Sequence, residues 1–328
     1  MRVLVTGGAG FIGSHLVEHL LDRGDEVTVL DDLSTGTLDN LEAVREHPAL
    51  DIVVGSILDR TMLARLAEGR ERVYHLAAAV GVRLIVEHPL ASMRTNIHGT
   101  ENVLDACRDA GASLLLVSTS EIYGKNTADR LSEESDRVLG SPLLSRWTYA
   151  AAKGIDEAFA HAYWQEFALP VSIVRLFNTV GPRQTGRYGM VVPTLVEQAL
   201  RERPLTVFGD GEQTRCFSYV GDVVPALRAL AEEPRAYGSA YNLGGAQEIS
   251  IGALAARIVE LLDSPSPIVH VPYEEAYAAG YEDMRRRVPD NRRAEALVGF
   301  EPRTDVDEII RIVAKSMAPR LAGVAGSR

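Results

Sequence analysis

The sequence is poor in the residues that crosslink small secreted proteins or hold a chain in a membrane. Cys107 and Cys216 are the only cysteines among 328 residues. Two cysteines make no disulfide framework and show no metal-ligand spacing, so we expect free thiols and no metal. No run of about 18 apolar residues is present, so no membrane span is predicted. Because Met1 leads directly into an apolar strand pattern rather than a signal peptide, we expect a cytoplasmic protein without a membrane partner.

An excess of basic residues is also missing. The chain has 34 lysines and arginines against 45 aspartates and glutamates, a formal net charge of −11. Nucleic-acid binding relies on clustered basic side chains, so we expect no nucleic-acid partner. A small phosphorylated ligand stays compatible with this charge because it needs only one local basic pocket. With 46% hydrophobic residues, a chain of this length can bury a sizeable core and is expected to form about two domains, or one large domain with an elaborated half.

Short apolar runs alternate with helical patterns along the first half of the chain. The runs are continuous rather than alternating, as in parallel strands covered on both faces. Helical patterns over 11–23 and 146–167 separate some of them. We therefore predict an α/β fold with a doubly wound parallel Rossmann sheet. The predicted strands are 3–5, 27–30, 52–54, 73–76, 114–117 and 171–176.

The sequence pattern changes after about Asn178, where glycines and prolines become frequent and the predicted elements become shorter. We predict a first domain over 1–177 and a smaller α+β substrate-binding region over 178–328. Because helical patterns persist in the second half, we expect residues of about 221–245 to return to the first domain.

A glycine-rich loop follows the first predicted strand and opens a helix. Its glycines at 7, 10 and 13 suit a tight turn, a close backbone approach to a pyrophosphate and close packing of the helix on the sheet. Asp31 and Asp32 end the second strand, where a carboxylate can bind both ribose hydroxyls and repel a 2′-phosphate. This combination predicts a dinucleotide site that prefers NAD to NADP.

A second set of residues suggests proton chemistry. Tyr149 and Lys153 are four residues apart, which places them on one face of a helix. An ammonium group beside a tyrosine stabilises the phenolate, which can then take a proton from a sugar hydroxyl. Thr119, Ser120 and Glu121 lie just past an apolar strand, at the edge where open α/β sheets bind ligands.

Together these motifs resemble the extended short-chain dehydrogenase/reductase superfamily, and more narrowly its nucleotide-sugar epimerase, dehydratase and decarboxylase branch. The resemblance runs along nearly the whole chain and includes the segments 209–217 and 287–290. It implies that NAD contacts Gly7, Gly10, Phe11, Ile12, Gly13, Asp31, Asp32, Ile57, Leu76, Tyr149 and Lys153. It also implies a UDP-sugar substrate that contacts Ser120, Asn178, Arg187, Val191, Arg215 and Arg287.

Members of this branch share one opening step, in which hydride passes from the sugar C4 to NAD. A 4,6-dehydratase carries an Asp-Glu pair where this chain has Ser120 and Glu121, so dehydration is disfavoured. Thr119-Ser120-Glu121, with Arg146 ahead of Tyr149, instead resembles UDP-glucuronate decarboxylases. The resemblance implies a catalytic set of Thr119, Glu121, Tyr149, Lys153 and Arg215.

Two questions stay open at the level of sequence. Residues 80–83 and 184–189 resemble 4-epimerases, so a nucleotide-sugar 4-epimerase is the alternative to NAD-dependent decarboxylation of UDP-glucuronic acid to a UDP-4-keto-pentose or UDP-xylose. Arg187 can contact a uronate carboxylate or remain a solvated loop charge. The helical patterns over 89–110 and 146–167 resemble the four-helix-bundle interface of this superfamily, so we expect a homodimer.

Overall fold

The computed structural model describes residues 1–81, 88–186, 190–272 and 284–325. Its centre is a seven-stranded sheet in the order β11-β6-β5-β4-β1-β2-β3, in which every neighbouring pair is parallel. The predicted doubly wound parallel sheet is confirmed. The strands are β1 Arg2–Thr6, β2 Glu26–Asp31, β3 Leu50–Val54, β4 Arg72–His75, β5 Ser113–Thr119, β6 Val171–Leu176 and β11 Ala240–Leu243.

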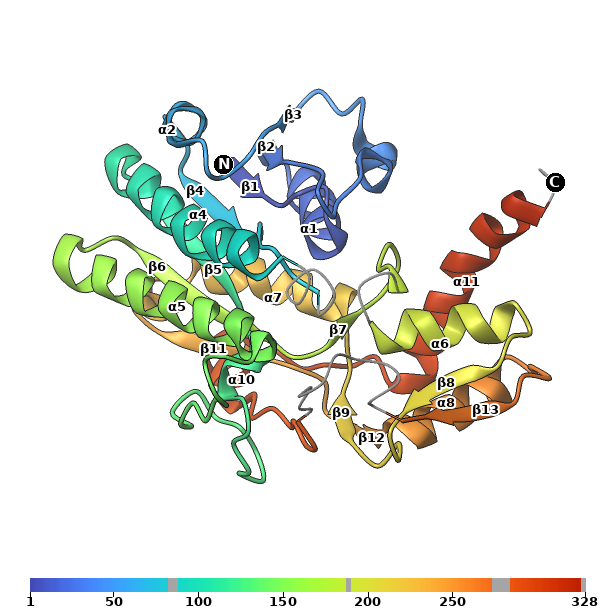
Figure 1. The fold of residues 1–328 in the computed structure, drawn as a ribbon. Helices are drawn as coiled ribbons and strands as arrows, with labels where there is room; N and C mark the ends of the chain where they lie inside the picture. Colours follow the sequence, from blue (N-terminus) through green and yellow to red (C-terminus); the bar gives the residue numbers. More distant parts are fainter. Residues whose placement is uncertain (82–87, 187–189, 273–283, 326–328) are drawn as a thin grey trace.

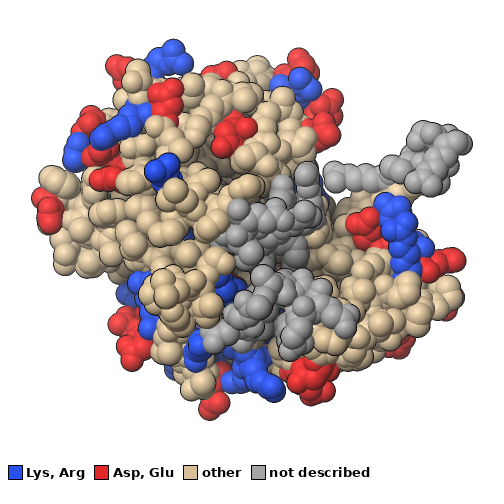
Figure 2. All heavy atoms as spheres, viewed as in Figure 1, with Lys and Arg blue, Asp and Glu red and all other residues tan. Residues whose placement is uncertain are grey.

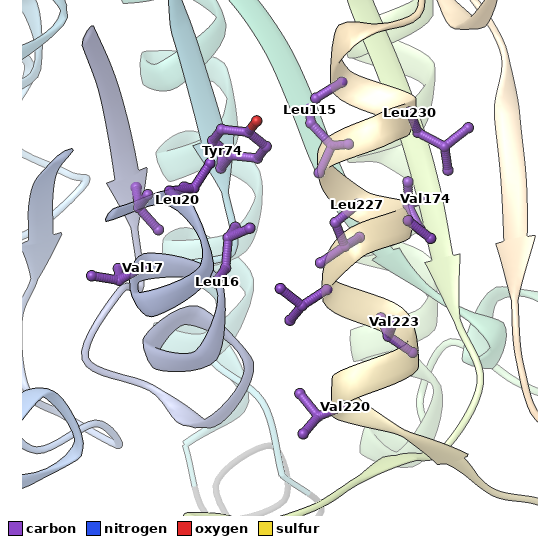
Figure 3. Close-up of a cluster of buried hydrophobic side chains, with 14 of the residues drawn as sticks. Leu16, Val17, Leu20, Tyr74, Leu115, Val174, Val220, Val223, Leu227 and Leu230 are labelled. Atoms are coloured by element: carbon purple, nitrogen blue, oxygen red, sulfur yellow. The ribbon is translucent and has the colours of Figure 1, made fainter. Parts of the chain in front are cut away.

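Helices cover both faces of this sheet (Figure 1). On one face pack α1 (Phe11–Asp22) and α7 (Val220–Glu232), whose buried side chains meet those of the strands (Figure 3). On the other face pack α2 (Arg60–Ala67), α4 (Pro89–Ala110) and α5 (Thr148–Phe167). Because both faces are covered, most strand residues are apolar on both sides of the sheet, which is why the strands read as continuous hydrophobic runs.

A second core forms beside the sheet from later parts of the chain. It unites α6 (Val191–Leu200), α8 (Ile251–Leu261) and α11 (Val306–Ala325) with the short strand β8 (Leu205–Phe208). Three two-stranded sheets complete this part, pairing β8 with β13 (Ile268–Val271), β9 (Thr214–Cys216) with β12 (Glu248–Ser250), and β7 (Thr179–Val180) with β10 (Ser218–Tyr219). Short helices are η1 Leu38–Val44, η2 Ser120–Tyr123, η3 Ser145–Trp147, η5 Pro234–Ala236 and α10 Arg292–Val298.

The chain crosses back to the sheet within its second half. Helix α7 packs on the sheet, and β11 pairs with β6 at the sheet edge. One predicted boundary was wrong: the helix predicted over 146–167 begins at Thr148, and Arg146 lies in the preceding 3₁₀ turn η3, where Trp147 is fully buried. No helix in the described part of the chain is both long and apolar enough to cross a membrane.

Candidate active site

The glycine loop lies where the strand order reverses, between β1 and β4, which is where open α/β sheets bind ligands. Gly7 has φ +75°, and a Cβ there would come within 2.6 Å of the backbone nitrogen of Ala77. A Cβ on Gly13 would lie 2.1 Å from the Gly7 carbonyl oxygen. Only glycine permits this close approach. Helix α1 has Gly10 as its N-cap, with no side-chain cap and no acid in its first turn, which suits a phosphate.

The two aspartates that end β2 have different surroundings. The buried Asp31 accepts hydrogen bonds from the backbone nitrogens of Ala9 and Leu33, each at 2.9 Å. Asp32 accepts one from the nitrogen of Ser34 at 2.9 Å. The Asp31 carboxylate is therefore fixed against the glycine loop. Both aspartates line the cavity described below, so these residues fit the adenosine ribose of a dinucleotide.

Helix α5 brings Tyr149 and Lys153 to the ends of the strands. Tyr149 is almost fully buried and hydrogen-bonds the side chain of Thr119 at the end of β5. Burial raises the pKa of Tyr149, as do the nearby carboxylates, whereas the Thr119 hydrogen bond lowers it. The Lys153 ammonium donates to the Asp156 carboxylate at 3.0 Å. The predicted tyrosine, lysine and threonine thus meet at one place.

Glu121 in η2 lies between two arginines. Its two carboxylate oxygens accept from Arg146 and from Arg287, each at 2.6 Å. Arg287 also donates to the Ser120 hydroxyl at 3.2 Å. Burial alone would raise the pKa of Glu121, but the two guanidinium groups outweigh it and lower the pKa to about 2. Glu121 is therefore ionised at neutral pH and acts as an acceptor and counter-charge.

Three further predicted substrate contacts come from the second half of the chain. Arg215 on β9 is buried and donates to the Thr214 carbonyl at 2.8 Å. Asn178 donates from its amide to the Cys216 carbonyl at 3.0 Å, which ties the end of β6 to β9. Val191 begins α6. Arg187 lies outside the described residues, so its predicted role stays a prediction.

The predicted site residues that the structure describes, from the glycine loop to Arg287, line one cavity of about 690 Å³. Its other predicted lining residues are Phe11, Ile12, Ile57 and Leu76. Among the described lining residues are five cations and three carboxylates, and two of the carboxylates are Asp31 and Asp32. Two of the cations, Lys153 and Arg183, are paired with Asp156 and Glu18 outside the lining. The remaining wall therefore keeps a small excess of positive charge, although the chain is acidic and mixes both signs of charge on the face in Figure 2. The described residues contain no cluster of three potential metal ligands.

Two members of the site have partners that the sequence motifs did not assign. Arg146 is predicted by its place ahead of Tyr149, but only the fold shows that it bonds Glu121. Asp156 was not predicted at all. Its spacing of three residues from Lys153 was an available signal, because residues three apart share a helix face.

The comparisons with known proteins agree with this geometry. A profile of the family described as GDP-mannose 4,6 dehydratase matches residues 4–313. A UDP-N-acetyl-α-D-glucosaminuronate decarboxylase from Bacillus cytotoxicus is 40% identical over 92% of this chain and 92% of its own length. UDP-glucuronic acid decarboxylase 1 from Xenopus tropicalis is 36% identical over 94% of this chain and 70% of its own length.

The fold has equally clear relatives among solved structures. A UDP-glucuronic acid 4-epimerase from Bacillus cereus, in complex with UDP-glucuronic acid and NAD, superposes with a TM-score of 0.88 at 28% identity, covering 98% of this chain and all of that one. The predicted resemblance is confirmed: the chain belongs to the GDP-mannose 4,6-dehydratase family of extended short-chain dehydrogenase/reductases.

Proposed function

We propose that this protein is an NAD-dependent decarboxylase of UDP-glucuronic acid. The observation that carries the proposal is one cavity in which the Thr119–Tyr149 pair and Lys153 lie beside the cationic wall of Arg146, Arg215 and Arg287. A UDP-uronate carries negative charge on its diphosphate and on its C5 carboxylate. The excess of cations over carboxylates along this wall suits such a ligand, and the decarboxylase relatives support the choice of reaction.

The residues at the loop end of the cavity fit NAD. The N-terminus of α1 and the loop of Gly7, Gly10 and Gly13 would hold the pyrophosphate. Asp31 would bind the ribose hydroxyls, Ile57 and Leu76 would contact the dinucleotide, and Lys153 keeps two ammonium protons for further acceptors after bonding Asp156. When bound, NAD supplies the acceptor for the hydride that leaves C4 of the sugar and returns it afterwards.

The residues around C4 account for the first step. Tyr149 acts as the base that takes the proton of the C4 hydroxyl while Thr119 holds the oxygen, and for this the Lys153 charge has to offset the rise in the pKa of Tyr149 that burial causes. The Lys153 charge favours the phenolate over the neutral phenol. Because the resulting ketone is β to the carboxylate, the bond from C5 to the carboxyl carbon can break, with its electron pair passing into an enolate.

The arginines account for the second step. Arg215 would hold the carboxylate and then stabilise the enolate that remains after CO2 leaves. Glu121 is ionised, so it orients Arg146 and Arg287 and leaves protonation of C5 to water.

We also assign residues 178–328 mainly to the sugar nucleotide and 1–177 to NAD, with about 221–245 returning to the sheet.

We further propose a cytoplasmic homodimer that associates through α4 and α5. Large apolar side chains remain exposed on these two helices: Leu90, Ile155, Trp164 and Phe167. Light scattering on the purified protein tests this assembly, and a mass equal to one chain at micromolar concentration would refute it.

The activity is tested with UDP-glucuronic acid labelled at its carboxyl carbon, NAD and purified protein. We expect labelled CO2 and a nucleotide sugar lighter by one CO2. Tyr149→Phe should retain NAD binding and reduce turnover by about 10²- to 10⁴-fold. Conversion without loss of mass would instead identify a 4-epimerase. Release of CO2 from only the N-acetylated uronate would keep the decarboxylase but move its substrate to that of the Bacillus cytotoxicus relative.

A further inference from the structure

A fully buried acid lies behind the proposed catalytic lysine. Asp156 is 0% exposed and Lys153 is 2% exposed, and the two are joined by the 3.0 Å bond from the ammonium to the carboxylate. Lys153 lines the cavity, whereas Asp156 lies one helical turn further along α5 and is not part of the lining. A carboxylate without access to water or ligand has no role as a surface charge. Its ionised partner is the reason for it to remain charged.

A series of polar side chains continues behind this pair. Thr100 of α4 lies beside Asp156; burial raises the pKa of Asp156, and Lys153 and Thr100 oppose that rise without cancelling it. The Thr100 hydroxyl is 3.0 Å from one ring nitrogen of His75, whose other ring nitrogen is 2.7 Å from the Thr6 hydroxyl. Thr6 directly precedes the glycine loop. Lys153 donates to one oxygen of Asp156, whereas the other oxygen is buried without a hydrogen-bond partner in the described part of the chain. The polar side chains behind it come from α4, β4 and β1, so no loop residue contributes to this series.

We propose that Asp156 is a positioning residue, whose buried carboxylate holds the Lys153 ammonium at the cavity and sets the pH range in which Tyr149 and Lys153 work together. This inference rests on the Tyr149–Lys153 pair of the proposed function. It adds a third charge to that pair, one that faces away from substrate and cofactor.

The sign of its effect follows from the charges around the pair. A negative charge opposes formation of the Tyr149 phenolate and favours the Lys153 ammonium. Among the residues that the structure describes, the other titratable groups nearby are Glu121 of η2, His75 of β4 and Glu157 of α5. Glu121 also raises the pKa of Tyr149 and Glu157 is paired with Arg175 of β6, but both charges stay the same when Asp156 is changed. Burial lowers the pKa of His75 to about 3, so it is neutral. Because the Asp156 charge raises the pKa of Tyr149, removing it should move the Tyr149 titration to lower pH.

The test compares wild-type holoenzyme with Asp156→Asn, which keeps the size and one acceptor but removes the charge. Two quantities are measured: the pH profile of kcat/KM, and the ultraviolet absorbance of the Tyr149 phenolate with Tyr149→Phe subtracted as background. We expect the limb of the profile that reports Tyr149, and the phenolate titration, to move down by about one pH unit, the size expected for a unit charge several ångströms away. Glu166→Gln removes an exposed charge from the same helix and should move neither.

A lower kcat/KM with unchanged limbs and an unchanged phenolate titration would overturn the proposal, because a merely structural residue behaves in this way. If Asp156→Asn does not fold, Asp156→Ser removes the same charge. Asp156→Glu keeps the charge and should therefore show the wild-type pH profile. The phenolate titration needs no substrate. A downward shift in a protein that does not decarboxylate UDP-glucuronic acid would therefore support Asp156 and refute only the proposed substrate.

Discussion

Glu121 carries a prediction about both stability and pH. Its carboxylate lies between two arginines whose side chains are less than a tenth exposed, with a bond of 2.6 Å to each. These charges lower its pKa from the usual 4.5 to about 2. That difference corresponds to about 3 kcal/mol of folding free energy, which Glu121→Gln should remove at neutral pH.

The pH dependence gives the direction of the effect. Because the pKa of Glu121 is lower in the folded than in the unfolded state, its contribution is complete above about pH 4.5. It disappears as the pH falls from 4.5 towards 2, where wild-type Glu121 takes up a proton. The Gln variant does not titrate at this position. The stability gap between the two proteins should therefore be about 3 kcal/mol at pH 7 and close as the pH falls through this range.

Urea unfolding followed by circular dichroism at a series of pH values measures this gap. The matched control is Glu134→Gln, which removes an exposed partner of Arg293 at 3.2 Å and should change stability by less than about 1 kcal/mol. UDP should stabilise Glu121→Gln more than wild type, because its phosphates replace the missing counter-charge. A gap that stays constant from pH 7 to pH 3 would refute the reasoning, since the lost energy would then not come from an ionised Glu121.

Three other predictions concern the cofactor site and the core. Gly13→Ala should raise the dissociation constant of NAD by at least about tenfold in calorimetric titration, because the new Cβ would lie 2.1 Å from the Gly7 carbonyl oxygen. Unchanged NAD affinity would contradict this, since the loop would then be able to move away from the Cβ. Asp31→Asn should weaken the binding of NAD and raise the ratio of NADP affinity to NAD affinity, both measured by calorimetric titration. An unchanged ratio would contradict a role of the Asp31 charge in choosing between the two cofactors. Arg175→Met should destabilise the fold by about 3–5 kcal/mol in urea, because Glu157 then keeps a buried charge without its partner; a loss under about 1 kcal/mol would count against this.

The sequence predicted the parts of the protein that depend on local pattern. Continuous apolar runs identified the strands of a sheet covered on both faces, and glycine spacing identified a loop that only glycine can form. Tyr149 and Lys153 were found because four residues along a helix bring two side chains to one face. The start of this same helix was predicted two residues too early, because Arg146 and Trp147 fit a helical pattern although the chain there makes a 3₁₀ turn.

Only the tertiary structure decided how the charges of the site are arranged. Arg287 is 166 residues away from Glu121, yet the two form an ion pair, and no local periodicity predicts a contact at that separation. The pKa of Glu121 depends on that pairing, as does its assignment to holding arginines rather than donating a proton. The sequence by itself determined which chemical groups are available and which lie near each other along one element. Folding determined which of them are buried together, and burial gives each charge its strength.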